Sequence, residues 1–172
     1  VFLIALLLTT LTQIWLAARH IRYVRAHQDK VPEKFASQIN LADHQKAANY
    51  TCAKTRAGYA GILLQVVLLL VFTLGGGLNA LSNFWANWLS DPLMHGMALI
   101  ISTFMIIGIA EIPLSYYRTF VIEEQYGFNK MTPGMFFTDL IKQSVLGLLL
   151  GAPLLFGVLW LMERMGESWW LY

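Results

Sequence analysis

Long apolar runs dominate the chain, and four of them predict helices that cross a membrane. They cover residues 1–18, 58–76, 93–113 and 141–162. A hydrocarbon core about 30 Å thick needs roughly 20 helical residues, which matches these lengths. The runs do not alternate polar and apolar residues as barrel strands do, and a segment in lipid must satisfy its own backbone hydrogen bonds. The pattern therefore predicts an all-α integral membrane fold with four transmembrane helices.

The connections between the runs carry helix signals of their own. Asn40 followed by Asp43 resembles a capping pair, so one helix is expected from about Leu41 and should continue into the second span. Thr132 before Pro133 is a strong helix start, with a hydroxyl cap and proline in the first helical position. The two connections that hold these signals, residues 19–57 and 118–140, are therefore expected to be helical as well.

Two features predict breaks. Three successive glycines, Gly75 to Gly77, each weaken a helix by about 1 kcal/mol relative to alanine, so the second span is expected to fray there. Pro113 removes a backbone donor and is expected to kink the third span or mark its end.

Composition excludes the main soluble classes. Hydrophobic residues make up 57% of the 172 residues, and charged residues make up 13%, about half of the roughly 25% typical of soluble domains. The net charge of +2 is too small for a nucleic-acid binder that neutralises phosphates. A single cysteine, Cys52, provides no disulfide framework. The lipid bilayer is the expected partner, and nucleic acid is not.

The basic residues predict an orientation. Eleven of the 12 lysines and arginines lie between residues 19 and 57 or between 118 and 142. By the positive-inside rule, loops 19–57 and 118–140 face the cytoplasm and the N-terminus lies outside. The opposite side carries tryptophans that suit an interfacial aromatic belt, namely Trp85, Trp88, Trp169 and Trp170.

Few ionisable residues suggest chemistry by themselves. None of the four histidines pairs with another at a spacing of four residues, so no H-E-x-x-H zinc helix is present and no catalytic or metal-ligating residue is expected in this chain. Glu111 lies in the otherwise apolar third span, where a carboxylate usually faces a polar interior or a water-filled cavity. The alternative is that Glu111 simply reaches the headgroups.

The stretch from Arg118 to Thr132, RTFVIEEQYGFNKMT, concentrates polar residues beside the membrane. Gly127 is placed to end a helix in a left-handed conformation. From composition alone, Glu123 and Glu124 are expected to lie on a solvated helix face. The polar members of this stretch are Arg118, Glu123, Glu124, Asn129 and Lys130.

The block RTFVIEEQYGFNK-x-T resembles the signature that precedes the fourth membrane helix in CAAX prenyl proteases, the integral-membrane zinc metalloendopeptidases. The preceding E-I-P-L-S-Y-Y resembles the acidic-x-Pro sequence that leads into this signature in the family. Residues 31–58 resemble the cytoplasmic stretch before the second membrane helix of the bacterial members. The resemblance covers nearly the whole chain. One departure is Met131, where a glutamine is more usual.

This resemblance implies a ring of membrane helices around a hydrated chamber with a zinc site on its cytoplasmic side. Zinc-activated water would hydrolyse a peptide bond with a glutamate as general base. The zinc ligands are expected downstream of residues 1–172, which would form a single N-terminal transmembrane domain that is inactive alone. The residues implied in lining the chamber or supporting the catalytic centre are Glu111, Arg118, Glu123, Glu124, Asn129 and Lys130.

The implied partners are the bilayer, the protein's own C-terminal catalytic domain, and peptide or misfolded membrane-protein substrates in the inner membrane of a bacterium. The alternative is a non-catalytic membrane scaffold or a small transporter subunit, with Glu111 lining an ion path. An H-E-x-x-H motif downstream would decide between the two.

Overall fold

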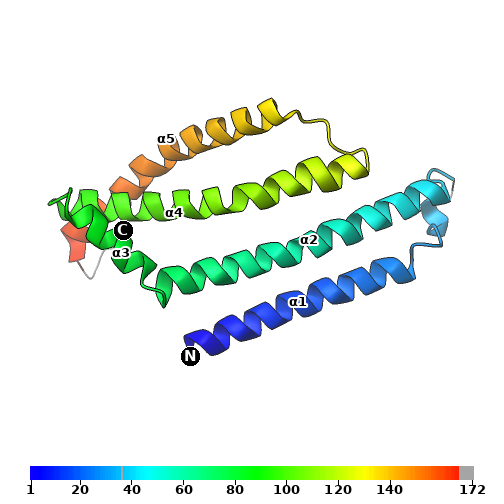
Figure 1. Cartoon of the computed structure of the whole chain (residues 1–172), viewed down its shortest axis with the longest axis horizontal. Coiled ribbons are helices and arrows are strands. Elements are labelled where there is room, and N and C mark those ends of the chain that lie inside the picture. Colours follow the sequence, from blue (N-terminus) through cyan, green and yellow to red (C-terminus); the bar gives the residue numbers. More distant parts are fainter. Residues whose placement is uncertain (36, 167–172) are drawn as a thin grey trace. The chain divides into compact units, whose positions relative to one another are not determined.

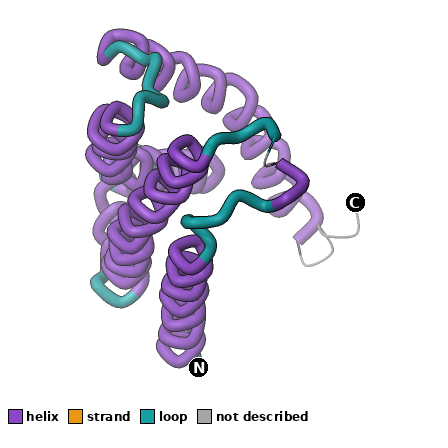
Figure 2. Tube along the Cα trace, turned by 90° about the vertical axis from the view of Figure 1, so that its right-hand side faces the viewer, coloured by secondary structure: helices purple, strands orange, loops and turns teal. Residues whose placement is uncertain are grey.

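The computed structural model describes residues 1–35 and 37–166, and every regular element in these ranges is a helix (Figure 2). Along the chain (Figure 1) these are α1 (Phe2–Ala26), a 3₁₀ turn (Glu33–Phe35), α2 (Leu41–Thr73), α3 (Gly77–Ala86), α4 (Pro92–Tyr117), a π-helical segment (Arg118–Glu123) and α5 (Pro133–Met165). Trp169 and Trp170, expected in the aromatic belt, lie outside the described residues.

The four predicted membrane helices are confirmed as helices. Within the described ranges, the helices long and apolar enough to cross a membrane are Phe2–Ala26, Leu41–Thr73, Pro92–Glu123 and Pro133–Met165. Many of their large apolar side chains are exposed on the chain itself, for example Leu149 at 64% and Leu154 at 72%. A water-soluble domain rarely exposes apolar surface so extensively, whereas lipid covers it without cost.

Both predicted helix starts are present. Asn40 Oδ1 accepts a hydrogen bond from the Asp43 backbone N–H at 2.8 Å, and Asn40 Nδ2 donates to Asp43 Oδ2 at 2.7 Å. The helix that follows is continuous from Leu41 to Thr73, as expected. The Thr132 hydroxyl accepts from the Met135 N–H at 3.3 Å, with Pro133 at the first helical position.

The two predicted breaks differ in outcome. α2 ends at Thr73, and Gly76 has a φ of +75°, so the glycines do end the helix. A Cβ at Gly77 would lie 2.9 Å from the Val71 carbonyl oxygen, so this tight turn needs glycine there. The expected end at Pro113 was wrong: α4 runs through it to Tyr117, since transmembrane helices tolerate an internal proline.

The chain forms two compact units. Unit 1 comprises residues 1–69 and 110–130, and therefore holds α1, most of α2 and the segment that follows α4. Its buried apolar residues come from all three elements: Ile21, Ala48, Cys52 and Ile122. One of them, Ile122, lies within the polar stretch 118–130, so that stretch contributes to the buried apolar part of the unit.

Unit 2 comprises residues 70–109 and the described residues from 131 onward. Here α3, which the sequence did not predict, is joined to α4 by side-chain hydrogen bonds of His95 and Trp85. His95 Nε2 donates to the Ser82 carbonyl at 3.0 Å, and Trp85 Nε1 donates to Ser102 Oγ at 3.0 Å. His95 thus donates a hydrogen bond that joins α4 to α3.

Candidate functional site

The signature segment, residues 118–130, folds onto α2 within unit 1, and Tyr50 is the centre of the contact. The Tyr50 hydroxyl donates to Glu123 Oε1 at 3.4 Å. The Tyr50 ring lies 4.8 Å from the Phe128 ring and 5.7 Å from the Tyr126 ring, centroid to centroid. One aromatic residue of α2 therefore holds both the carboxylate and the end of the segment.

The paired carboxylates occupy different environments. Glu123 is half-buried and faces Tyr50, whereas Glu124 is exposed and accepts from Asn129 Nδ2 at 2.9 Å. The two glutamates therefore cannot be equivalent: Glu123 belongs to the packed face, and Glu124 closes the turn.

A tight reversal follows the carboxylates. Gly127 has a φ of +70°, as the sequence predicted, a region that side chains with a Cβ rarely adopt. The Glu123 carbonyl accepts from the N–H groups of Phe128 and Asn129, at 2.8 and 3.2 Å. The reversal thus satisfies carbonyls at the helix end and returns Phe128 to Tyr50.

Two lysines of α2 lie beside the aromatic cluster. Lys46 Nζ is 5.5 Å from the centre of the Phe128 ring, and Lys54 Nζ is 5.6 Å from the centre of the Tyr50 ring. Both distances suit a cation–π interaction. The positive charges frame the aromatic residues on which Glu123 rests.

Arg118 begins the segment and lies over Gly61 of α2. A Cβ at Gly61 would be only 2.9 Å from Arg118 Nη2, so glycine there leaves room for the guanidinium. Arg118 Nε is buried, and no described residue accepts its hydrogen bond. A buried guanidinium N–H without an acceptor is costly, so this atom is suited to a partner outside the described residues.

The remaining sequence candidates are not drawn into this cluster. Glu111 and Lys130 are both exposed. Within the described ranges the one ion pair within 4.0 Å joins Lys142 and Asp139, so neither residue takes part in one. Their functional roles stay predictions.

The described residues do not fit a catalytic zinc ion. No group of three or more histidine, cysteine, aspartate or glutamate side chains lies close enough among them to hold a metal. A catalytic zinc needs about three protein ligands, so no reaction step can be derived through a metal in this part of the protein.

Sequence reasoning missed the residues of α2 that organise the site. Lys46, Tyr50 and Lys54 are spaced four residues apart, which places them along one helix face. This spacing is the sequence feature from which a packed helix face could have been predicted. It marks a helix face that packs on an aromatic partner, although it does not identify the partner.

Comparisons with known proteins agree on one family. Residues 20–172 match the family model described as the CAAX prenyl protease N-terminal region with five membrane helices. A CAAX prenyl protease 1 homolog of Caenorhabditis elegans is 31% identical over 153 residues, covering 88% of this chain and 34% of the relative. CAAX prenyl protease 1 of Saccharomyces cerevisiae is 27% identical over 145 residues, covering 78% of this chain and 32% of the relative.

A solved structure supports the fold. The crystal structure of S. mikatae Ste24p matches with a TM-score of 0.84 at 22% sequence identity, over 95% of this chain and 39% of that one. The chain thus spans about a third of the length of the curated relatives above. These relatives are eukaryotic, so the predicted bacterial type stays a prediction.

Proposed function

We propose that this chain, which belongs to the CAAX prenyl protease N-terminal family, forms the membrane wall and substrate passage of a peptidase whose catalytic centre lies outside these 172 residues. Family membership favours this function over the scaffold or transporter alternative. The proposal assigns zinc-dependent peptide-bond hydrolysis to the intact protein, with the zinc ligands on its C-terminal catalytic domain.

One observation carries the role given to the signature segment. Glu123 is half-buried, and one of its oxygens accepts from Tyr50. No described residue bonds its other oxygen, Oε2, which can therefore accept a hydrogen bond from the catalytic domain. Carboxylates that hold the N–H of a ligating histidine act in this way, by fixing the orientation of the ring. Glu123 is accordingly a positioning residue.

Arg118 supports the same arrangement from the other end of the segment. Its buried Nε lacks an acceptor among the described residues, and the guanidinium can bind a carboxylate or a carbonyl. A substrate main chain in the passage or a residue of the catalytic domain would supply that acceptor. Glu111, Glu124, Asn129 and Lys130 would then line the passage more loosely, since all but Asn129 are exposed.

The experiment that tests this function uses the intact protein in detergent. Cleavage of a fluorogenic peptide should depend on zinc and stop with a chelator, while metal analysis should find about one zinc per chain. Residues 1–172 expressed alone should neither cleave the peptide nor retain stoichiometric zinc, because they offer no three-ligand cluster among the described residues. Tightly held zinc in the fragment would overturn the assignment.

The proposal also includes the orientation and the setting. Loops 19–57 and 118–140 would face the cytoplasm of a bacterium and the N-terminus would lie outside its plasma membrane, with peptides or misfolded membrane proteins as substrates. Single cysteines at Gln28, Asn87 and Gln125, introduced after replacing Cys52 by alanine, test this. A membrane-impermeant thiol reagent added outside should label position 87 alone, and labelling of position 28 would invert the orientation.

A further inference from the structure

The carboxylate of Glu123 is held at one oxygen only by the described residues. Oε1 accepts from the Tyr50 hydroxyl at 3.4 Å, while no described residue bonds Oε2. A glutamate side chain has three rotatable bonds, and a half-buried one samples several staggered rotamers unless a partner selects one of them. The direction in which Oε2 points therefore depends on Tyr50.

The Tyr50 ring is fixed by its own neighbours. Phe128 and Tyr126 lie 4.8 and 5.7 Å from it, centroid to centroid, at interplanar angles of 59° and 65°. Lys54 Nζ lies 5.6 Å from the centre of the same ring. Tyrosine has only two side-chain torsions, so a half-buried ring with these three neighbours keeps little freedom. The Tyr50 hydroxyl is therefore in place before Glu123 meets any further partner.

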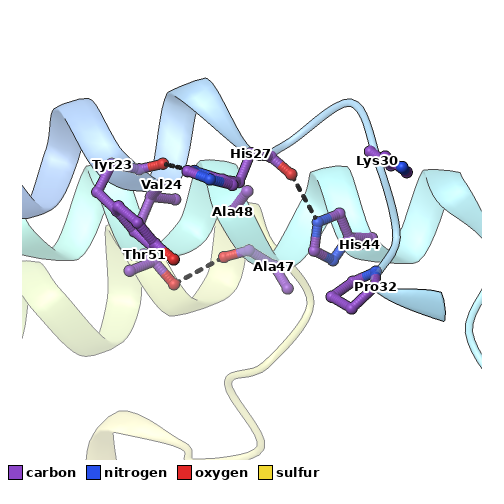
Figure 3. A pocket seen from close by; sticks show the side chains of 9 residues that line it. All are labelled: Tyr23, Val24, His27, Lys30, Pro32, His44, Ala47, Ala48 and Thr51. Carbon is purple, nitrogen blue, oxygen red and sulfur yellow. Dashed lines mark hydrogen bonds between the residues drawn. The ribbon is translucent and has the colours of Figure 1, made fainter. Parts of the chain in front are cut away.

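The part of α2 that carries Tyr50 is attached to α1 by a different face. Figure 3 shows that face, where Ala47, Ala48 and Thr51 of α2 and Tyr23, Val24 and His27 of α1 surround a shared pocket. His44 Nε2 donates to the His27 carbonyl at 3.1 Å, and Gln45 Nε2 donates to Asp29 Oδ1 at 3.1 Å. These bonds hold the start of α2 while its other face presents Tyr50 to the signature segment.

The length of the hydrogen bond favours a role in orientation over one in stability. Most O–H···O bonds are about 2.5–3.0 Å long, so at 3.4 Å the Tyr50 hydroxyl contributes little to the free energy of unfolding. Hydrogen bonds in active sites are often long in the free enzyme and shorten in the complex with substrate. A phenylalanine would keep the ring packing, so packing does not account for the hydroxyl.

We propose that Tyr50 is a positioning residue of the peptidase, which acts on turnover through Glu123. Its hydroxyl holds Oε1 and thereby aims the unoccupied Oε2 at the catalytic domain. The braced start of α2 and the aromatic neighbours give the hydroxyl a fixed position, as support for a functional group requires. The inference rests on the role proposed for Glu123 in the intact protein, and it extends the functional apparatus to α2.

The test measures kcat and KM of the intact protein in detergent with a fluorogenic peptide. Tyr50→Phe should lower kcat about threefold to tenfold, the change expected when one hydrogen bond is lost from the arrangement that supports the transition state. KM should stay unchanged, because Tyr50 orients Glu123 and does not bind the peptide. The melting temperature should fall by only about 1–2 °C, so the variant folds.

A double-mutant cycle shows whether Tyr50 acts through Glu123. Glu123→Ala removes the carboxylate and leaves nothing for the hydroxyl to orient. Tyr50→Phe added to Glu123→Ala should therefore lower kcat by less than about twofold further, although it costs more in the parent protein. A purely structural role of Tyr50 would instead give the same loss in both backgrounds.

Tyr23→Phe is the matched control. Tyr23 also lies in unit 1, is 64% exposed, and its hydroxyl has no hydrogen-bond partner among the described residues. The same atom is removed from another tyrosine of the same unit, so kcat should equal that of the parent protein.

Four outcomes would overturn the proposal, and they have different meanings. An unchanged kcat in Tyr50→Phe, with a large loss in Glu123→Ala, would refute the role of Tyr50 and leave that of Glu123 standing. Independent losses that multiply in the double variant would show that Tyr50 acts by another route. A raised KM at constant kcat would assign Tyr50 to peptide binding. Wild-type turnover in Glu123→Ala would refute the role of Glu123 as well.

Discussion

The signature segment and the membrane part of α5 differ in the interactions of their side chains. In the segment, Glu123 bonds Tyr50 of another helix and Glu124 bonds Asn129. In α5, every residue from 141 to 151 is exposed on the chain, and the side-chain hydrogen bond found there is a local one, from Ser144 to the Leu140 carbonyl.

This difference separates two sources of structure. α5 is helical because its residues are apolar and satisfy their backbone groups within the helix, so many other apolar sequences would serve equally well. The geometry of the signature segment depends on individual side chains, because a carboxylate, an aromatic ring and a glycine with positive φ must coincide. Substitutions should therefore have large effects in the first region and small effects in the second.

The largest effect is expected at Glu123. Glu123→Gln in the intact enzyme keeps the size and an acceptor but removes the charge, and should lower peptide turnover about 10–100-fold at an unchanged melting temperature. Glu124→Gln, its neighbour on the exposed side, is the matched control and should reduce turnover far less. Wild-type turnover in both single variants and in the double variant would show that Glu123 and Glu124 are only part of a solvated helix face.

Gly127→Val should have the next largest effect, which is a loss of stability rather than of turnover. A left-handed backbone costs a residue with a Cβ about 1–2 kcal/mol, and the strain would also displace Phe128 from Tyr50. Gly151→Val on α5 is the control, because a Cβ there meets no described heavy atom within 4 Å. Thermal melts of both variants in detergent measure the difference, and equal melting temperatures would contradict the comparison.

Tyr50→Phe isolates the hydrogen bond from the ring packing. The ring contacts with Tyr126 and Phe128 remain, while the donor to Glu123 is lost. A typical hydrogen bond contributes about 0.5–1.5 kcal/mol, and at 3.4 Å this one should lie near the lower value. Chemical denaturation measures the loss, with Tyr117→Phe as an exposed control. A cost above that of Gly127→Val would mean that the hydroxyl does more than the geometry indicates.

The last comparison tests burial alone. Ile122→Val and Ile141→Val remove the same methylene group, one from the buried side of the segment and one from exposed α5, where Ile141 is 65% exposed. Ile122→Val should cost about 0.5–1.5 kcal/mol because it leaves a small cavity. Ile141→Val should stay within about 0.5 kcal/mol. Parallel melts suffice, and the comparison fails if the two variants are equally stable.

Local features of the structure were open to prediction from the sequence. Thr132 before Pro133 and Asn40 before Asp43 predicted helix starts because a cap is formed by residues three apart. Gly127 predicted a left-handed turn for a similar reason, since backbone strain depends on one residue and its neighbours.

Long-range features were not predictable. Tyr50 and Glu123 are separated by 73 residues, and nothing in either local pattern names the other. α3 was missed because glycines at its start weaken helix propensity, while its stabilising contacts come from His95 and Ser102 of α4. The π-helical segment after Tyr117 was not predicted either. The only expected break in this region was at Pro113, and α4 continues through that residue.

The uninterrupted helix α2 has a consequence for distance. Its 33 residues extend about 50 Å, whereas the hydrocarbon layer is about 30 Å thick. Tyr50 lies eight residues before the apolar part of α2, which starts at Gly58, so it stands about 12 Å along the axis from the edge of that layer. Because the intervening backbone is a single hydrogen-bonded helix, Glu123 is held at a set height above the bilayer. An extended chain covers the same distance in about four residues.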